Sequence, residues 1–277
     1  MFRQRNGTVG DDVAESIVGC RGGPPVTCSP GSSRLAPLTG DAPSPSRADM
    51  RHAIYPYQPP RALDPNLWQV TGSLKLPIPR NMTVWRAPDG RLVLYSVIAM
   101  HEEGMGALEQ LGRPAFMVIP HKRHHMDAPF YKARYPDLRV LAENREPANG
   151  VAIDGSLEEL EPLGVHGERV PGTSCEDLAL DLPVDGGRAL CLCELVGNLR
   201  LPGLVGGILG RIVGPPGGGG FGIARAVRFR EVVDRGRVRQ WLLGQSRRED
   251  LRMLLLGHGA PVVDDVRAAL ALAATHV

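Results

Sequence analysis

Short apolar segments alternate with helix-forming stretches along most of this chain, and this alternation restricts its fold more than any other feature. Leu67–Thr71, Ala115–Ile119 and Leu251–Leu256 are apolar runs of the length and composition typical of buried strands. Glu102–Leu111 and the stretch from about Val263 instead repeat their apolar residues at helical spacing. Strands and helices that alternate in both halves predict a layered α/β domain whose sheets are covered by helices.

Local signals add boundaries to this pattern. The turn Pro88-Asp89-Gly90, between strands predicted at 82–86 and 91–96, indicates a β-hairpin. Asp127 has the chemistry of a helix cap, with Pro129 in the first turn. Ser156 and Glu159 have the spacing of a capping box. Further strands are predicted at 138–142, 165–170, 178–182 and 189–195.

Glycine and proline divide the chain into two parts. The 277 residues include 34 glycines and 25 prolines, which excludes a helical bundle. Many of these residues lie before residue 61 without any strand or helix periodicity, so we expect 1–61 to be disordered or low-complexity and 62–277 to form the domain. One hypothesis is that translation starts at Met50. Residues 1–49 would then come from a gene start assigned too far upstream.

Charge and cysteine content exclude several classes of protein. The 32 basic and 30 acidic residues leave a formal charge of only +2, so nothing in the electrostatics favours a nucleic-acid partner. The 5 cysteines are odd in number and too few for a disulfide scaffold, which fits a reducing compartment. Because no apolar run has the length of a signal peptide or a membrane span, we expect a cytoplasmic protein without a membrane span.

Histidine carries the chemical signal. His121, His124, His125 and Asp127 lie within seven residues, on a loop that leaves a predicted buried strand and enters a helix. Open α/β sheets place their sites at such strand ends. Imidazole and carboxylate together suit zinc, iron or manganese. In the alternative without a metal, Asp127 caps a helix and His121 is exposed to solvent. The imidazoles of His124 and His125 then make hydrogen bonds.

Two further candidates follow predicted strands in the second half. His258 lies between Gly257 and Gly259, which allow the backbone to turn sharply and bring the imidazole close to another group. Glu194 ends an apolar strand, and a carboxylate buried there needs a partner because a lone buried charge is costly. The alternative for His258 is a simple turn residue. Glu176 is a weaker candidate of the same kind as Glu194.

The order of these motifs resembles a known family over about three quarters of the chain. The motifs are Leu67-Trp-Gln-Val with the Asp89-Gly90 hairpin, the Pro120 to His125 loop followed by Tyr131–Pro136, Pro171-Gly172-Thr173, and Gly257-His258-Gly259. From about Leu67 onward the sequence resembles the metallo-β-lactamase fold and, within it, the uncharacterised DUF4336 group. The resemblance implies a four-layer αβ/βα sandwich, with metals at the edge of the two sheets.

The chain departs from the metal motif of that superfamily, His-x-His-x-Asp-His. Alignment from Pro120 places His121 on the first position and then Arg123, His125 and Met126 on the next three. A later His falls on Thr173, the bridging Asp on Glu194 and the last His on His258. The resemblance therefore implies one divalent metal (Zn, Fe or Mn) held by His121, Glu194 and His258, with His124 or His125 displaced into the gap, and not the usual two-metal site.

Two functions from different classes remain open on the sequence. A bound metal would polarise a carbonyl or phosphoryl oxygen and activate water, giving a hydrolase of an ester, amide or phosphoester with Asp127 or Glu194 as proton acceptor. A metal-free binding or scaffold protein is the alternative, favoured by Arg123 and Met126 at ligand positions. The small-molecule substrate and the oligomeric state are not indicated by any motif.

Other patterns are set aside. Gly217, Gly219 and Gly222 have the spacing of a dinucleotide-binding fingerprint, but a proline-rich loop precedes them where a strand is required. We expect a flexible loop there, after an apolar helix at 201–213. Cys191 and Cys193 have no further soft ligands at suitable spacing and are expected to be small core residues.

Overall fold

The structure is a computed structural model that describes residues 52–73, 78–174, 177–199 and 220–277, together with residues 203, 207, 208, 210, 212 and 214–216. All of these lie within one compact unit, Arg47–Val277. The predictions for residues 1–49, for Glu176, for the glycine-rich residues 217–219 and for most of 201–213 fall outside the described residues.

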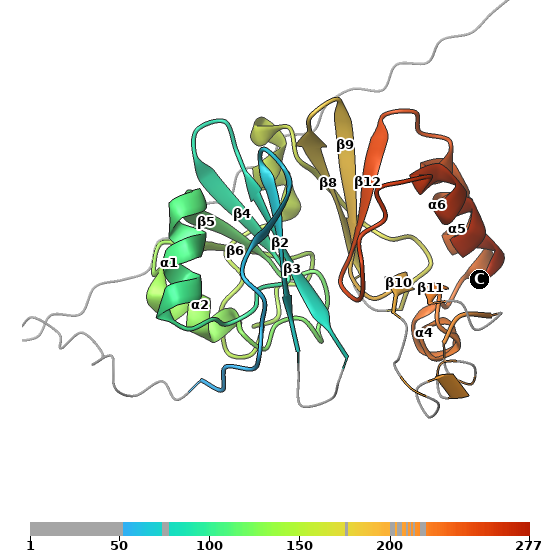
Figure 1. Ribbon diagram of the computed structural model, residues 1–277, viewed down its shortest axis with the longest axis horizontal. Helices are drawn as coiled ribbons and strands as arrows, with labels where there is room; N and C mark the ends of the chain where they lie inside the picture. The colour runs from blue at the N-terminus through green and yellow to red at the C-terminus, as the bar shows by residue number, and fades with distance from the viewer. Residues whose placement is uncertain are drawn as a thin grey trace, which may run out of the picture. The chain divides into compact units, whose positions relative to one another are not determined.

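The first sheet has six strands whose order in space follows their order in the chain (Figure 1). Its strands are β1 (Arg61–Asp64), β2 (Leu67–Gly72), β3 (Arg80–Arg86), β4 (Arg91–Tyr95), β5 (Arg113–Val118) and β6 (Arg139–Leu141). The first four are antiparallel, and the β3–β4 pair is the predicted hairpin. β4, β5 and β6 run parallel, so their carboxyl ends meet at one edge of the sheet.

The second sheet has four strands in the order β12-β9-β8-β7. They are β7 (His166–Arg169), β8 (Leu178–Val184), β9 (Gly187–Leu192) and β12 (Leu251–Leu256). β9 and β12 are parallel neighbours although they are far apart in the chain, and Leu192 pairs with Leu256 at their ends. A separate two-stranded ribbon is formed by β10 (Gly197–Asn198) and β11 (Phe221–Gly222).

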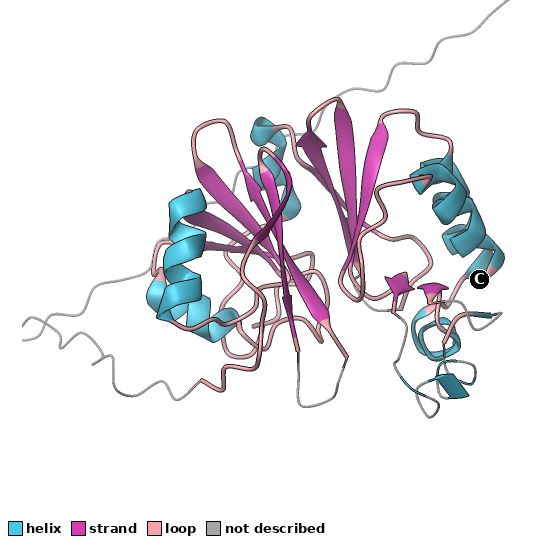
Figure 2. Cartoon of the chain, viewed as in Figure 1, coloured by secondary structure: helices cyan, strands magenta, loops and turns pink. Residues whose placement is uncertain are grey.

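Helices cover the outer face of each sheet (Figures 1 and 2). The first sheet carries α1 (Glu102–Leu111) and α2 (Ala128–Arg134), and the second carries α5 (Arg235–Ser246) and α6 (Val266–Thr275). Two short helices are the 3₁₀ helix η1 (Leu157–Leu163) and α4 (Arg225–Glu231). Among the described residues no helix is both long and apolar enough to cross a membrane.

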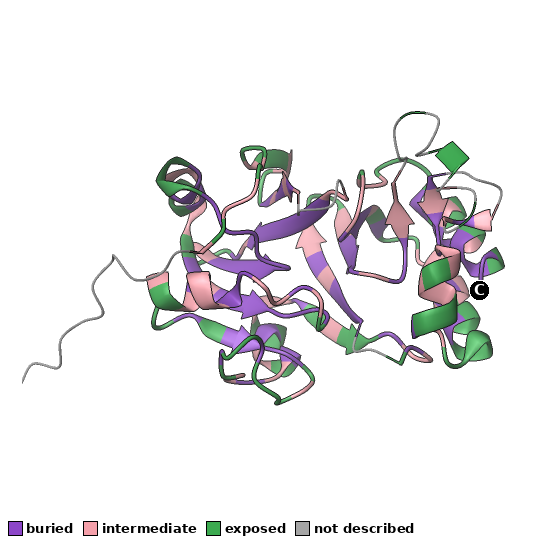
Figure 3. Ribbon diagram, turned by 90° about the horizontal axis from the view of Figure 1, so that it is seen from below, coloured by how far each residue is buried: buried purple, intermediate pink, exposed green. Residues whose placement is uncertain are grey.

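Three apolar clusters fill the space between these layers, and Figure 3 shows the buried residues along the strands. The central cluster joins the two sheets, with Tyr95 and Phe116 from the first against Leu180, Cys191 and Leu255 from the second. The other two clusters lie between each sheet and its helices. This layering confirms the predicted four-layer αβ/βα sandwich, and both Cys191 and Cys193 are core residues as predicted.

Asp127 and Ser156 occupy the predicted N-cap positions, but neither side chain makes the expected cap hydrogen bond. α2 begins directly after Asp127, but the Asp127 side chain makes no cap hydrogen bond because Arg80 and His52 pair with its carboxylate. Ser156 likewise makes no side-chain cap, and the following segment is a 3₁₀ helix. The predicted strand 189–195 ends earlier, at Leu192, so that Glu194 lies in the loop that follows.

Candidate metal centre

Two side chains of the site occupy equivalent places on neighbouring strands. Leu192 and Leu256 pair at the ends of β9 and β12, and Glu194 and His258 each lie two residues further on. His124 comes from the first sheet, on the loop between β5 and α2. The site therefore lies at the carboxyl ends of parallel strands from both sheets, where open α/β sheets bind their ligands.

These three side chains converge on one small space. His124 Nε2 lies 3.1 Å from Glu194 Oε1 and 3.2 Å from His258 Nε2, and the distance from His258 Nε2 to Glu194 Oε1 is 3.6 Å. Among the described residues, this is the only group of three or more His, Cys, Asp or Glu side chains placed to share an ion. His124 is buried, while Glu194 and His258 are half-buried and approachable.

The spacing of the donor atoms fits a tetrahedral ion. With ligand distances of about 2.0–2.1 Å, the edges of a tetrahedral zinc site are about 3.3 Å long. The three separations of 3.1, 3.2 and 3.6 Å bracket that length. Two imidazoles and one carboxylate also match the ligands of catalytic zinc sites, which leave a fourth position for water or substrate.

A backbone clamp holds His258. Its Nδ1 lies 2.8 Å from the carbonyl oxygen of Pro79, which requires Nδ1 to donate and leaves Nε2 to face the site. Asn81 donates from Nδ2 to the carbonyl oxygens of Leu256 and Gly259, at 2.8 and 2.7 Å. The N–H group of Asn81 also donates to the carbonyl of Gly257 at 2.8 Å. The start of β3 thus fixes the turn that carries His258.

Glycines on either side of His258 allow this turn. A Cβ on Gly257 would lie 2.5 Å from the carbonyl oxygen of Cys193, so only glycine lets the ends of β9 and β12 approach each other. Gly259 has a φ of +92°, and a Cβ there would collide with the carbonyl oxygen of Asn198. The close approach of Gly257 to Cys193 brings His258 next to Glu194.

Ser96 supports His124 from the end of β4. Its Oγ lies 2.7 Å from His124 Nδ1. A hydroxyl can donate to this nitrogen or accept from it, so His124 can present either an N–H or a lone pair at Nε2. Ser96 is fully buried and has a φ of +61°, a left-handed conformation that is unfavourable for a residue with a Cβ. This strain lies next to a ligand candidate.

Asp177 holds the loop that carries Glu194. Its carboxylate accepts backbone N–H groups from Leu195 at 2.6 Å, from Glu194 at 3.2 Å and from Cys193 at 3.3 Å. Burial raises the pKa of Asp177 to about 7, although the N–H groups of Leu195 and Glu194 oppose that rise. Three consecutive amides are thereby fixed, and the Glu194 side chain projects toward the imidazoles.

Charge interactions within the group favour an ionised carboxylate. Burial acts to raise the pKa of Glu194, but the interactions with His124 and His258 outweigh it and hold the pKa well below its usual range. Burial lowers the pKa of His124. For His258 burial also acts downward, but the Glu194 carboxylate prevails and raises the pKa. A carboxylate anion between two imidazoles is a suitable ligand set for a divalent cation.

The structure places the other predicted site residues outside this group. His121 is buried beside it, with its ring centroid 6.4 Å from that of His124. His125 is half-buried and does not belong to the group of three. Asp127, predicted as a proton acceptor, pairs with the buried Arg80 and with His52, whose Nε2 lies 2.6 Å from Asp127 Oδ1. It also accepts the N–H group of Ala99 at 3.0 Å.

Sequence reasoning missed the residues that support the site. Ser96, Asn81 and Asp177 lie in segments predicted only as strand ends or loops, and each acts on a residue distant in the chain. Glu231, at the end of α4, is buried and pairs with Arg123, which lies 108 residues earlier in the chain. No local pattern marks such contacts, since their partners are brought together only by the complete fold.

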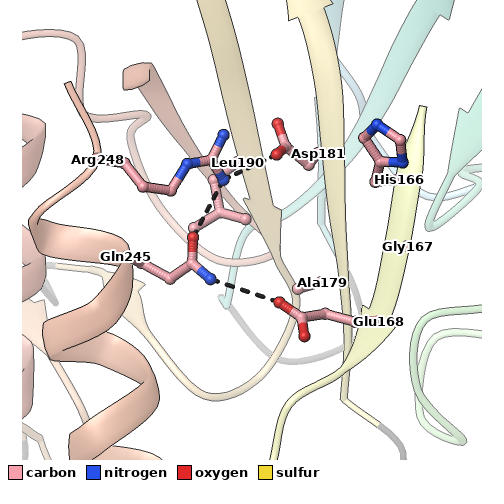
Figure 4. A pocket seen from close by; sticks show the side chains of 8 residues that line it. All are labelled: His166, Gly167, Glu168, Ala179, Asp181, Leu190, Gln245 and Arg248. Carbon is pink, nitrogen blue, oxygen red and sulfur yellow. Dashed lines mark hydrogen bonds and ion pairs between the residues drawn. The ribbon is translucent and has the colours of Figure 1, made fainter. Parts of the chain in front are cut away.

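A separate hollow of about 220 Å³ lies on the outer face of the second sheet, beside α5 (Figure 4). Its polar side chains pair with one another: Arg248 Nη1 lies 2.8 Å from Asp181 Oδ2, and Gln245 Nε2 donates to Glu168 Oε1 at 3.4 Å. None of its lining residues belongs to the group of His124, Glu194 and His258. Asp181 is neutralised by Arg248, while within the described part of the chain Glu168 accepts hydrogen bonds only from the neutral side chains of Trp241 and Gln245.

Comparison with known proteins identifies the fold. No protein-family model and no curated protein matches the sequence. Among solved structures, the metallo-β-lactamase FIM-1 from Pseudomonas aeruginosa in its mono-zinc form is 11% identical and covers 80% of this chain and 96% of its own at a TM-score of 0.53. The metallo-β-lactamase DIM-1, exposed to ceftazidime, is 14% identical and covers 80% of this chain and 99% of its own at a TM-score of 0.53.

A metallo-β-lactamase from Hirschia baltica is similar at the same level, with 12% identity and a TM-score of 0.50. The match covers 78% of this chain and 98% of the Hirschia baltica protein. These matches cover 78–80% of this chain, and sequence identity at this level establishes the fold alone. This chain has the metallo-β-lactamase fold.

Proposed function

We propose that the protein is a metal-dependent hydrolase with a single divalent ion held by His124, Glu194 and His258. The observation that carries the proposal is the convergence of His124 Nε2, His258 Nε2 and Glu194 Oε1 within 3.1 to 3.6 Å of one another. Zinc, iron and manganese all suit these donors. When bound, such an ion lowers the pKa of water and polarises a carbonyl or phosphoryl oxygen.

The residues of the chain supply binding and orientation. Pro79 holds the His258 ring, Ser96 holds the His124 ring, and Asp177 fixes the backbone of Glu194. Such supporting contacts orient ligands and raise their basicity. Asp127 is tied to Arg80 and His52, so of the two carboxylates first considered as proton acceptors only Glu194 lies at the site, where it is a ligand candidate.

The substrate class proposed from this chemistry is an ester, an amide or a phosphoester. We assign the hydrolytic unit to residues 62–277 and place it with the DUF4336-like group, on the strength of the Gly257-His258-Gly259 turn and the hairpin at Asp89-Gly90. The competing function is a metal-free binding protein. The contact between Arg123 Nε and Glu194 Oε1, at 3.6 Å, is the observation in its favour.

Elemental analysis of the purified protein separates the two functions. The parent and the His125→Ala control are expected to hold close to one equivalent of metal, because His125 lies outside the ligand group. His258→Ala and Glu194→Ala are each expected to lose most of it. A parent that holds no metal after dialysis against zinc, iron or manganese at neutral pH would contradict the metal-dependent hydrolase and favour the metal-free alternative.

A further inference from the structure

The ring of His121 is oriented differently from the rings of the two ligand histidines. Its Nδ1 accepts the backbone N–H group of Arg123 at 3.1 Å. In a neutral imidazole one nitrogen accepts and the other carries the proton, so the proton of His121 lies on Nε2. Because that nitrogen has no free lone pair, His121 is a hydrogen-bond donor there and not a metal ligand.

This donor is buried and lacks an acceptor. The His121 side chain is 1% exposed, and its Nε2 has no hydrogen-bond partner among the described residues. The nearest carboxylate oxygen, Glu231 Oε2, is 4.0 Å away, which is too far for a hydrogen bond. Native proteins rarely leave a buried donor unpaired, and each exception calls for an explanation such as a catalytic role or a bound water or ion.

A guanidinium lies beside the same space. Arg123 pairs with Glu231 through Nη2, and its Nε lies 3.6 Å from Glu194 Oε1. Its side chain is 34% exposed, so Arg123 is reached by solvent although it pairs with Glu231. Arg123 is therefore held between the metal candidate and Glu231, next to the His121 ring that its own backbone orients.

The charges of this cluster depend on the metal. Glu194 and Glu231 together outweigh the single guanidinium of Arg123, so the metal-free cluster repels anions. A divalent cation at Glu194 reverses the sign and leaves the cluster net positive. Arginine binds planar carboxylates and phosphates through its fork of N–H groups, and a neutral imidazole N–H adds a directed bond.

We propose that His121 Nε2–H and the Arg123 guanidinium form an oxyanion-binding subsite beside the metal, which selects substrates that carry a phosphate or carboxylate group. This inference rests on the proposed single-metal site. It assigns His121 and Arg123 to substrate binding and excludes His121 from the ligand set.

The test measures metal affinity and anion affinity separately, by calorimetry on the zinc-loaded protein with inorganic phosphate or acetate as the probe. His121→Phe is expected to weaken binding of the preferred anion at least about tenfold, the value of one hydrogen bond to a charged group. Its zinc affinity is expected to stay within about threefold of the parent, because a donor is lost and not a ligand. His121→Gln, which retains an N–H donor, should recover part of the anion affinity.

His125→Phe is the matched control in the same loop, and both of its affinities should equal those of the parent. Tighter binding of phosphate than of acetate assigns phosphate-bearing substrates, and the reverse assigns carboxylates. If His121→Phe loses zinc as fully as His258→Ala does, His121 is a ligand and the subsite is refuted. Unchanged anion binding in His121→Phe with normal zinc affinity refutes the subsite alone, whereas a parent without zinc affinity refutes the metal site and the subsite together.

Discussion

His124 and His258 present the same ring nitrogen, Nε2, to Glu194, and each is held from behind by an oxygen atom. The carbonyl of Pro79 fixes His258, and the Ser96 hydroxyl contacts His124. His121 has the proton on the other ring nitrogen: its Nδ1 accepts a backbone N–H group, so its Nε2 carries the proton. At the scale of single residues, hydrogen bonds on the far side of each ring decide which histidines can bind a metal.

Asn81 is the residue whose loss should damage the site most without removing a ligand. Its side chain and backbone donate three hydrogen bonds to the 256–259 turn. Asn81→Ala is predicted to weaken metal binding by about 10- to 100-fold, as expected for a group that orients a ligand. Zinc titration against a competing chelator measures the change. Asn66→Ala, at an exposed position, is the control and should bind as the parent does.

Burial of neutral His121 predicts a pH dependence of the metal-free protein. Burial lowers its pKa from 6.5 to about 4. Between these values the unfolded chain binds a proton that the folded chain does not, so the free energy of unfolding falls as the pH falls through this window. His121→Phe should flatten the slope of unfolding free energy between pH 6.5 and 4, measured by urea denaturation.

The exposed His166→Phe should leave that slope unchanged and serves as the control. An equally steep slope in His121→Phe would show that His121 is not held neutral in the folded protein.

At the scale of elements, the ends of β9 and β12 are the decisive feature, because their pairing places Glu194 and His258 in equivalent positions. Gly257 makes this possible by its approach to Cys193. Gly257→Ala is predicted to cost about 1–3 kcal/mol of unfolding free energy, as overpacking does, and to reduce metal affinity as His258 shifts.

Gly106→Ala is the matched control for that substitution, since a Cβ at this helical position meets no atom within 4 Å. It should stabilise the protein by about 0.5–1 kcal/mol and leave metal affinity unchanged. Chemical denaturation and zinc titration of both variants check the pair. Normal zinc affinity in Gly257→Ala would show that the strand ends do not position His258.

Apolar periodicity predicted the elements that bury a continuous face. β2, β5, β12 and α1 occur where the sequence indicated them, because each has the apolar run or stripe that its layer requires. The strands β1, β10 and β11 were not predicted. The four residues of β1 are largely exposed, and β10 and β11 have two residues each, so none of them carries a usable hydrophobic pattern.

At the scale of the whole molecule, the order of short motifs was enough to predict the four-layer fold, which the similarity to FIM-1 and DIM-1 supports. The details of the site were not accessible in the same way. Asn81 and Leu256 are 175 residues apart, and Asp177 acts on Glu194 through backbone groups. An alignment of motifs could assign His121 to a ligand position, but only the folded loop reveals that His124 faces Glu194 and His258.

The most direct test of the central claim is an anomalous difference map from crystals grown with zinc. We predict one peak, at about 2.0–2.2 Å from His124 Nε2, His258 Nε2 and a carboxylate oxygen of Glu194, with His121 Nε2 outside ligand distance. A map without a peak at these residues, or one in which His121 replaces His124 as a ligand, would contradict the account.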